Sequence, residues 1–388
     1  MTRRLLDGSP DLTGHRRRHG PVPYHGKDAL VGALEAAGLT GRGGAGFPTH
    51  RKLAAVGGAG RRVVVVANAA EGEPASAKDR ALLAANPHLV LDGLRIAADA
   101  LGTRALHLYL GARADSGPVA AALAERAGSG YDRAGVAVHT APDTFVAGEE
   151  SAVVAAIEGR PPVPADKARP VFAHGVGGAP TLVLNVETLA HLALVARYGP
   201  AWFRAAGTAD EPGTFLVTVG GAVREPGVRE VPYGVPLGDV VIPAAPVRAV
   251  LAGGYHGTWA PLDPRIPLSR AGLAAYGATP GAGVVSALDA RRCPLDAAAR
   301  VVAYLAGQSA GQCGPCLNGL PRLAETFGAL ARGHPQQGEV ARLAGLVAGR
   351  GACHHPDGAV RFVASTLSFF ADDVAAHLAG RCVAAGVR

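Results

Sequence analysis

Hydrophobic and polar positions follow two different periods along the first half of the chain. A run of valines, Val63–Val66, predicts a buried strand, and similar runs predict strands at Leu106–Leu110, Val136–Thr140 and Thr181–Leu184. Helical periodicity fills the intervals, over residues 28–39, 48–56, 87–101, 117–127, 150–158 and 186–198. Strands that alternate with helices in this way predict an α/β domain over residues 21–212.

The second half of the chain changes character twice. Residues 213–292 contain short β-rich runs such as Phe215–Val219, with Gly227, Gly234 and Gly238 as turn signals, and predict a small mixed α/β domain. From Asp296 the pattern is helical, interrupted by two cysteine-bearing loops, so residues 293–388 are predicted to be a helical domain. Residues 1–20 are predicted to be a basic N-terminal tail.

Composition fits this organisation and restricts the location. The chain has 388 residues, of which 48% are hydrophobic and 18% charged, so it can build sizeable cores and is not a disordered chain. No apolar run reaches the ~18 residues of a membrane span, so no direct membrane insertion is expected. The pair Arg3–Arg4 is followed by Asp7–Asp11 where an export signal needs an apolar stretch. Together with five cysteines and no disulfide framework, these features predict a cytoplasmic protein, with a place peripheral to a membrane complex as a further option.

Positive charge raises the question of nucleic acid. The net charge is +7, and part of the excess lies in Arg16–Arg18. No helix-turn-helix, zinc-finger or RNA-binding signature accompanies it, so no nucleic-acid partner is expected. A solvated basic surface explains this charge, and docking of an acidic electron-transfer partner is a second use of it. Only four of the 38 basic residues are lysines (Lys27, Lys52, Lys78, Lys167), and three of them lie within or beside glycine-rich blocks, which suggests that lysine geometry matters there.

The glycine-rich loop of residues 41–46 is the first candidate site. Gly41, Gly43 and Gly46 match G-x-G-x-x-G, but a predicted helix precedes them where a dinucleotide fold requires a strand. Glycines still allow backbone amides to approach an anion, and Lys52 can supply a countercharge. The loop therefore predicts a site for a phosphate-bearing ligand, with a flexible surface turn as the alternative.

Four blocks of sequence resemble one known family. They are Gly38–Thr49, Asn68–Pro74 with Lys78–Arg80, Gly148–Ala152 and Asn185–Ala190. In this order they are similar to the NADH-oxidising, FMN- and iron–sulfur-containing flavoprotein subunit of respiratory complex I, and to the equivalent subunits of NAD-linked hydrogenases and formate dehydrogenases. The resemblance covers nearly the whole chain from residue 21. It implies an FMN- and NAD(H)-binding α/β domain, a β-grasp (SLBB-like) domain over 213–292 and an iron–sulfur-binding helical domain over 293–388.

The resemblance also implies roles for individual residues. Residues implied to bind FMN or NAD(H) are Gly41, Arg42, Gly43, Gly44, Gly46, Phe47, Lys52, Asn68, Glu71, Glu73, Gly148, Glu149, Glu150, Lys167, Phe172 and Asn185. Glu71 and Glu73 are the implied catalytic residues, and Phe47 and Phe172 the implied aromatic contacts of the nicotinamide nucleotide. Two positions near the expected flavin depart from the family pattern. Ala70 replaces an acidic residue and Phe145 an aromatic hydroxyl, so the affinity and potential of the flavin are expected to differ.

The cysteines allow two interpretations. Cys313-Gly314-Pro315-Cys316 has the form of a thioredoxin-like dithiol, but a predicted helix precedes it instead of a strand. The alternative is a metal site in which Cys353 is a third ligand, and the resemblance implies an iron–sulfur cluster, 4Fe–4S, at Cys313, Cys316 and Cys353. The family's remaining cysteine position is Ala310. Either a fourth ligand comes from water, His354, His355, Cys293 or Cys382, or a three-iron cluster forms, or the cluster is lost.

Three functions follow from these residues. The first is an oxidoreductase of the NADH dehydrogenase type that passes a hydride from NADH to FMN, then single electrons to the cluster and to a separate acceptor, either a ferredoxin-like protein or another complex subunit. The second is a divergent, non-catalytic relative that binds flavin or a partner, as Ala70 and Ala310 suggest. The third is a thiol–disulfide oxidoreductase that uses Cys313 and Cys316.

Overall fold

The computed structural model describes residues 4–56, 62–132, 134–166, 169–382 and 384. By their contacts these residues form two compact units. The first comprises residues up to Gly72, Ala77–Val217 and Val228–Gly234, and the second comprises Glu73–Ser76, Thr218–Gly227 and the remainder from Val235. The predicted boundary between 213–292 and 293–388 lies inside the second unit, and that division stays a prediction.

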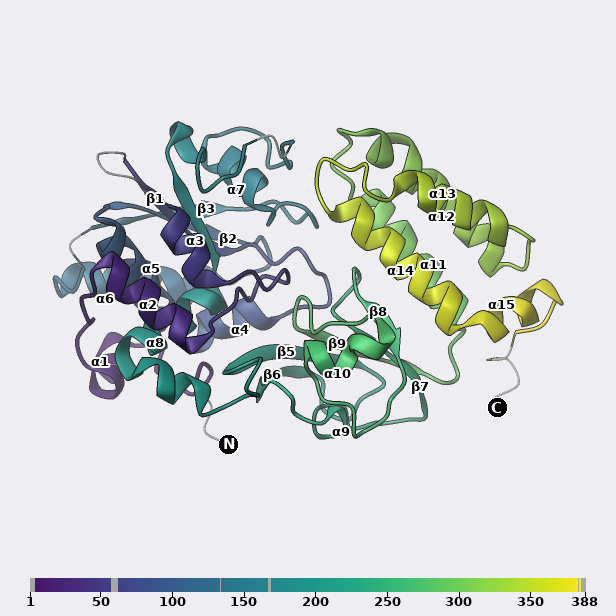
Figure 1. Ribbon diagram of the computed structural model, residues 1–388, viewed down its shortest axis with the longest axis horizontal. Coiled ribbons are helices and arrows are strands. Elements are labelled where there is room, and N and C mark those ends of the chain that lie inside the picture. The colour runs from purple at the N-terminus through teal and green to yellow at the C-terminus, as the bar shows by residue number, and fades with distance from the viewer. Residues whose placement is uncertain (1–3, 57–61, 133, 167–168, 383, 385–388) are drawn as a thin grey trace. The chain divides into compact units, whose positions relative to one another are not determined.

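The first unit is built on a parallel sheet, which confirms the predicted α/β class. Its four strands are β1 (Val64–Ala69), β2 (Ala105–Leu110), β3 (Val136–Thr140) and β4 (Thr181–Asn185), in the order β3-β2-β1-β4 (Figure 1). The chain moves outward from β1 to β2 and β3 and then returns to the other side of β1 for β4. The strand order therefore reverses between β1 and β4, which is where open α/β sheets bind their ligands.

Helices cover both faces of this sheet. The helical elements of this unit are α1 (Leu12–His19), α2 (Lys27–Ala37), α3 (Thr49–Ala55), α4 (Lys78–Ala85), α5 (Pro87–Leu101), α6 (Gly117–Gly128), α7 (Glu150–Ile157), the 3-10 turn η1 (Val176–Gly178) and α8 (Val186–Arg204). Val65 and Ala67 of β1 belong to a large core with α2, α5 and α8, whereas Val64 and Val66 belong to a smaller core with Val153 of α7. Side chains alternate along a strand, so Asn68 points to the α7 face.

Two elements of the first unit differ from the predictions. The predicted N-terminal tail contains the helix α1, and Lys78–Ala85 forms the unpredicted helix α4. Arg16–Arg18 of α1 are exposed, as expected for a solvated basic surface, but His15 on the same helix is buried. Basic residues mask the amphipathic pattern of α1, because only Leu12 and His15 face inward.

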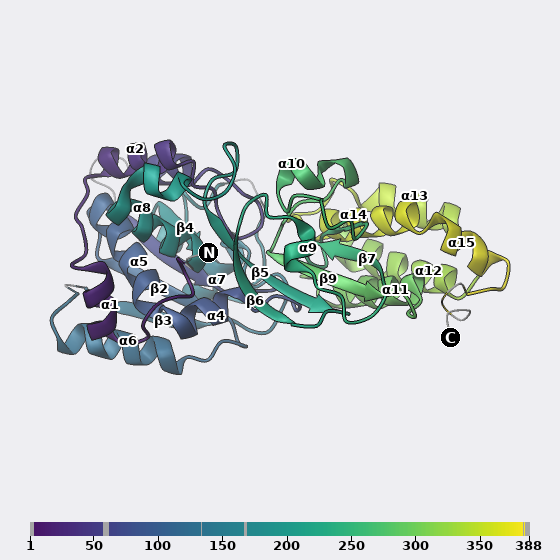
Figure 2. The ribbon, with the colours of Figure 1, turned by 90° about the horizontal axis from the view of Figure 1, so that it is seen from below.

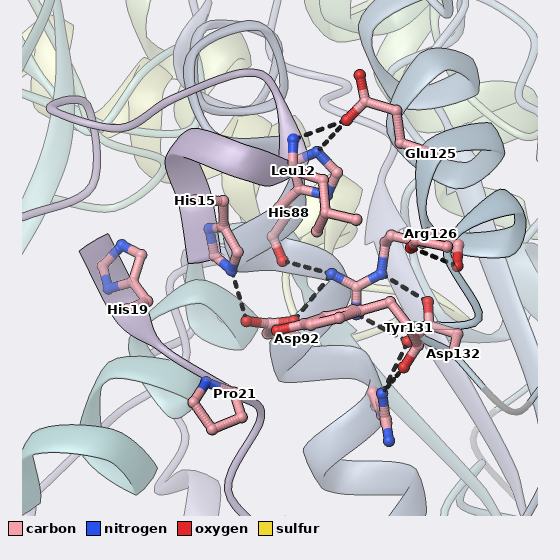
Figure 3. Close-up of polar contacts among 12 residues, drawn as sticks. Leu12, His15, His19, Pro21, His88, Asp92, Glu125, Arg126, Tyr131 and Asp132 are labelled. Atoms are coloured by element: carbon pink, nitrogen blue, oxygen red, sulfur yellow. Dashed lines mark hydrogen bonds and ion pairs between the residues drawn. The ribbon is translucent and has the colours of Figure 1, made fainter. Parts of the chain in front are cut away.

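A buried ionic network holds α1 against the first unit. Figure 3 shows His15 and Arg126 pointing toward the carboxylate of Asp92, a residue of α5. The His15 Nε2 lies 2.7 Å and the Arg126 Nη1 2.8 Å from the Asp92 carboxylate, and Arg197 also pairs with it. Burial alone would raise the pKa of Asp92, but the hydrogen bond from His15 and the charge of Arg126 outweigh burial and hold it well below its usual range.

The second unit combines a mixed sheet with a helical region. The sheet contains β5 (Thr214–Gly221), β6 (Gly227–Pro232), β7 (Val247–Ala252), β8 (Thr258–Ala260) and β9 (Val284–Asp289) in the order β6-β5-β9-β7-β8, together with α9 (Leu237–Val240), α10 (Arg270–Leu273) and η2 (Ala274–Tyr276). The division between the units passes through β5 and β6. β9 runs parallel to β5 and antiparallel to β7. The small mixed α/β character predicted for this region is therefore present, and its β-grasp assignment stays a prediction.

The helical region follows the sheet, as predicted. It comprises α11 (Pro294–Gly307), the π-helical turn η3 (Pro315–Gly319), α12 (Leu320–Ala331), α13 (Gln337–Val347), α14 (His355–Phe369) and α15 (Ala371–Leu378) (Figure 2). Trp259 of β8 anchors α14 through a hydrogen bond of 3.0 Å from its ring nitrogen to the Thr366 hydroxyl. Among the described residues, no helix is both long enough and apolar enough to cross a membrane.

Candidate functional site

The carboxyl ends of β1 and β4 bring two predicted site residues together. Asn68 and Asn185 are register partners on these neighbouring strands. The Asn185 side-chain amide donates to the Asn68 carbonyl at 3.4 Å, and the Asn68 amide donates to the Gly148 carbonyl at 2.9 Å. Two of the four sequence blocks therefore meet at the point where the strand order reverses, and a third lies against them.

The glycine loop lies at the same edge and is open. Gly43, Ala45 and Phe47 are exposed, whereas Arg42 is buried. A Cβ placed on Gly43 would meet only the Asn185 Cβ, at 3.6 Å, so the fourth block lies beside this loop. Gly44 and Gly46 have φ angles of 107° and 66°, which side chains other than glycine rarely adopt. The loop therefore presents backbone, without side-chain bulk, next to the ends of β1 and β4.

Arg42 itself supports the loop from beneath. Its backbone amide donates to the Thr188 hydroxyl at 2.8 Å, and its guanidinium donates to the Thr40 hydroxyl at 2.8 Å and lies over the Tyr233 ring. Both terminal nitrogens of the guanidinium therefore have protein partners. The Arg42 Nε is buried without a hydrogen-bond partner among the described residues.

Lys52 and Glu150 form an ion pair near the end of β4. The Lys52 ammonium contacts the Glu150 carboxylate and donates to the Val183 carbonyl at 2.7 Å. Glu149 caps α7, because its carboxylate accepts from the amides of Ser151 and Ala152 at 2.9 and 3.2 Å. Of the two adjacent glutamates predicted to bind the nucleotides, Glu149 therefore caps a helix and Glu150 pairs with Lys52.

Sequence reasoning left Lys78 and its partners off the list of site residues. Lys78 is 1% exposed, and its ammonium lies 2.6 Å from Asp79, 3.0 Å from Glu187 and 3.3 Å from the Asn185 amide oxygen. Burial alone would lower the pKa of Lys78, but the carboxylates of Asp79 and Glu187 outweigh burial and raise it. Burial raises the pKa of Glu187, and the positive charge of Lys78 partly offsets this rise. This buried cluster fixes Asn185 from below. The scarcity of lysine in the sequence was the one feature that could have marked Lys78 as a site residue.

The loops that follow β1 and precede α7 touch through two glycines. A Cβ on Gly148 would lie 2.2 Å from the Ala70 carbonyl oxygen, and a Cβ on Gly72 would lie 2.0 Å from the Phe145 carbonyl oxygen. Ala70 and Phe145 are the two departures from the family pattern that were expected near the flavin. They therefore lie in one pair of contacting loops.

The predicted catalytic glutamates belong to different units. Glu71 is half-buried in the first unit, and its carbonyl accepts from Arg113 at 3.0 Å. Glu73 belongs to the second unit, is 4% exposed, and its carboxylate accepts from the amides of Ala75 at 3.1 Å and Tyr255 at 2.7 Å. The catalytic roles of both stay predictions.

Four predicted nucleotide contacts remain: two aromatic residues, one lysine and one glycine. Phe47 is 53% and Phe172 37% exposed, so both rings are available for stacking. Lys167 lies outside the described residues. Gly41 closes the glycine loop, since its amide donates to the Phe47 carbonyl at 2.8 Å.

The residues at this edge fit a flavin nucleotide. Exposed loop amides and the nearby Lys52 suit a phosphate, and the side-chain amides of Asn68 and Asn185 can orient polar atoms. Within the described part of the chain, the buried hydroxyl of Tyr109 has no hydrogen-bond partner, although Tyr109 is the register partner of Asn68. A buried polar atom without a partner is costly to a folded chain.

Three cysteines gather in the second unit. The Cys313 thiol accepts hydrogen bonds from the backbone amides of Ala352 and Cys316. Burial alone would raise the pKa of Cys313, but these hydrogen bonds outweigh burial and lower it, whereas burial and the Cys313 thiol raise the pKa of Cys316. Cys316 and Cys353 are buried, and the Cys353 charge acts on Cys316. Cys353 and the dithiol, 37 positions apart in the sequence, therefore form one thiol cluster.

This cluster fits an iron–sulfur centre better than a dithiol enzyme. The backbone amide of Ala310 donates to the Cys316 thiol, so the position where the family has a cysteine lies at the cluster. Helix α11, not a strand, precedes Cys313, and the turn η3 follows it. A helix after the first cysteine is compatible with the thioredoxin arrangement, but the helix before it is not, because a strand is required there.

Two of the proposed fourth ligands lie too far away. Cys293 caps the start of α11, whereas the Cys316 carbonyl accepts from Ser309 just beyond the other end of that helix. A helix of 14 residues is about 21 Å long. Cys382 lies beside Cys293, within 4.8 Å between sulfur atoms, so it is equally remote. His355 is buried, which lowers its pKa, and its Nε2 forms a hydrogen bond of 2.8 Å with the Leu305 carbonyl. His354 is exposed and pairs with Asp357.

Comparison with known proteins gives consistent matches over this chain. Residues 34–194 match the Nuo51 FMN-binding domain, and residues 296–377 match the NADH-ubiquinone oxidoreductase-F iron-sulfur binding region. Similar proteins include an NADH-quinone oxidoreductase F subunit of Rhizobium meliloti, 30% identical over 95% of this chain and 93% of that protein. The NADH-quinone oxidoreductase F subunit of Streptomyces coelicolor is 31% identical over 97% of this chain and 90% of that protein.

Solved structures agree with the sequence matches. A chain of an NAD+-reducing NiFe hydrogenase in its air-oxidised state superposes with a TM-score of 0.83 at 34% identity, over 91% of this chain. The chain spans 63% of that hydrogenase chain. The predicted FMN and iron–sulfur cofactors are confirmed by the two domain matches.

Proposed function

Since this chain belongs to the family of NADH-quinone oxidoreductase F subunits, we propose that it passes a hydride from NADH to FMN and then single electrons to an iron–sulfur cluster. It is an oxidoreductase of the NADH dehydrogenase type, with NAD(H), FMN and a 4Fe–4S cluster as its cofactors. A separate acceptor protein receives the electrons, because the relatives are subunits of larger enzymes. Such an acceptor is ferredoxin-like or another member of a complex.

One observation carries the proposal. The reversal of strand order between β1 and β4 places Asn68 and Asn185 side by side, beneath an exposed glycine loop. A bound FMN accepts both electrons of a hydride and releases them singly, which is the chemistry that links NADH to a one-electron carrier. The chain supplies binding and orientation at this edge.

Each part of the edge has a proposed role. The amides around Gly43 and the ammonium of Lys52 hold the phosphate, and the amides of Asn68 and Asn185 orient polar atoms of the ligand. The exposed rings of Phe47 and Phe172 stack on the nicotinamide nucleotide. Glu71 lies near Lys78, whose pKa it helps to raise, so its carboxylate is held within this charged edge.

The cysteine cluster supplies the outlet for electrons. Cys313, Cys316 and Cys353 would hold the cluster, which carries single electrons. Backbone amides already donate to two of these thiols, and such hydrogen bonds favour thiolates as ligands. With Ala310 in the fourth position, the ligand there comes from water or from His354 next to Cys353.

The test is flavin binding followed by reduction. Protein purified without oxygen is expected to retain or take up FMN, whose visible absorbance bleaches when NADH is added. Gly43→Ala is expected to weaken FMN binding about tenfold, ~1.4 kcal/mol, because the added methyl fits the folded chain but fills the ligand's approach. Gly32→Ala is the matched control, since a Cβ there meets nothing within 4 Å.

The outcomes separate the alternatives. Protein that binds no FMN contradicts the proposal outright. Bound FMN that NADH does not bleach favours the non-catalytic relative. Insulin reduction that depends on Cys313 would support the thiol–disulfide alternative instead.

A further inference from the structure

A second metal-binding geometry lies in the helical region of the second unit. Cys293, His377 and Cys382 place one sulfur or nitrogen atom each within 4.8 Å of one another, and all three are half-buried. Cys293 precedes α11, His377 lies in the last turn of α15, and Cys382 follows α15. We propose that these three residues form a zinc site, separate from the iron–sulfur cysteines.

The distance between Cys293 and His377 fits zinc before any ion is added. The Cys293 sulfur lies 3.4 Å from the His377 Nε2. Zinc–sulfur bonds of about 2.3 Å and zinc–nitrogen bonds of about 2.0 Å at a tetrahedral angle place these ligand atoms about 3.5 Å apart. Two thiolates and an imidazole are a ligand set that selects zinc over hard cations such as magnesium.

The surroundings of the ligands point the same way. The His377 Nδ1 lies 2.7 Å from the Ala331 carbonyl, to which it must donate a proton, so the Nε2 lone pair faces Cys293. This is the arrangement in which a carbonyl fixes the tautomer of a metal-bound histidine. The Asp296 amide donates to the Cys293 sulfur at 3.4 Å, so this sulfur lies at the N-terminus of α11.

The position of the site suggests its effect. Cys293 and Cys382 lie just outside the first and last helices of the region that holds Cys313, Cys316 and Cys353. A zinc ion there would join the two ends of this region and restrict its unfolding. Three protein ligands leave one tetrahedral position for water or another ligand.

Zinc and iron contents measured on the same samples test the site. Full-length protein is prepared without oxygen, incubated with Zn²⁺ and desalted, and both metals are quantified. We expect about one zinc per chain, and at least tenfold less zinc in Cys293→Ser, His377→Ala and Cys382→Ser with iron unchanged. Cys313→Ser is the matched control, because it is expected to lose iron and keep zinc.

A second measurement uses the unaltered chain and does not depend on the folding of variants. Zinc is expected to protect Cys293 and Cys382 from alkylation, as mapped by mass spectrometry of the peptides. Equal alkylation with and without zinc overturns the proposal, as does zinc that persists in Cys293→Ser or disappears in Cys313→Ser. A disulfide between Cys293 and Cys382 in protein kept under reductant also overturns it.

Discussion

Replacing Lys78 by methionine tests how the carboxyl edge of the sheet is held. Lys78, Asp79 and Glu187 have side chains that are 2%, 2% and 1% exposed. Methionine keeps much of the apolar stem but removes the ammonium, so two buried carboxylates lose their shared cation. Removal of one partner from a buried ion pair costs about 3–5 kcal/mol, because an uncompensated charge remains.

That cost is large for a domain of this size. At about 2–4 °C per kcal/mol, the expected fall in melting temperature is on the order of 10 °C. The side-chain amide of Asn185 donates to Asp79 at 2.7 Å and its oxygen accepts from Lys78 at 3.3 Å, so the substitution also releases the residue next to the glycine loop. We therefore expect Lys78→Met to lose FMN more readily, even below its new melting temperature.

Thermal unfolding and chemical denaturation of three variants, compared with the unaltered protein, measure the effect. Arg80→Met, two positions onward and exposed, is the matched control and should change stability by less than about 0.5 kcal/mol. Lys78→Met combined with Glu187→Gln removes one of the two stranded charges and should recover part of the loss that Lys78→Met alone shows. If Lys78→Met unfolds like Arg80→Met, or if Glu187→Gln brings no recovery in that background, the buried ion cluster does not hold this edge.

Three further predictions concern other parts of the molecule. Burial keeps the pKa of His191 well below its usual range, so this imidazole stays unprotonated in the folded state. The free energy of unfolding should therefore fall by about 2 kcal/mol between pH 6.5 and pH 5, as the unfolded chain binds a proton there. In denaturation of His191→Gln, this fall should be smaller by about the same amount. Gly148→Ala should destabilise the protein by about 1–3 kcal/mol, because its methyl would meet the Ala70 carbonyl, while Gly135→Ala, with open space around it, should not. Ala310→Cys should increase the iron retained after exposure to air, whereas Ala341→Cys on the exposed side of α13 should leave iron unchanged.

The positions of Asn68 and Asn185 near the ends of strands could be predicted from the sequence because they depend on local order. Asn68 and Asn185 each end a strongly apolar strand, and the carboxyl ends of parallel strands meet at one edge. The order β3-β2-β1-β4 could not be read from the sequence, since nothing local states on which side of β1 the fourth strand pairs. The structure therefore adds the reversal point, which explains why these two asparagines adjoin.

Residues that act through distant partners escaped prediction. Lys78–Asp79–Arg80 at the start of a helix has the composition of an exposed turn, yet Lys78 and Asp79 are buried because Glu187 and Asn185 reach them from α8 and β4. His15 is buried for a similar reason, since Asp92 lies on α5. A charged residue is buried only when its partner is present, and that partner is invisible to a local pattern.

The five cysteines also show that a local sequence pattern does not reveal distant partners. Cys313 and Cys316 are close in sequence and were expected to act together, but Cys293 and Cys382 are 89 positions apart and fit no metal-binding spacing. Folding of α11 to α15 returns the chain end to the start of α11. Two of the fourth ligands considered for the cluster are thereby placed at the wrong end of a helix about 21 Å long.

The two departures from the family pattern affect chemistry more than structure. Ala70 and Phe145 contribute backbone carbonyls to the contacts with Gly148 and Gly72, and any side chain at 70 or 145 supplies those same carbonyls. The backbone contact between the two loops is therefore independent of the substitutions, and Asn68 still donates to the Gly148 carbonyl. What is lost is one carboxylate and one hydroxyl from the edge expected to face the flavin. Loss of a negative charge makes reduction of a nearby group easier, since an added electron then meets less repulsion. We therefore expect the substitutions to raise the flavin potential while the site keeps its shape.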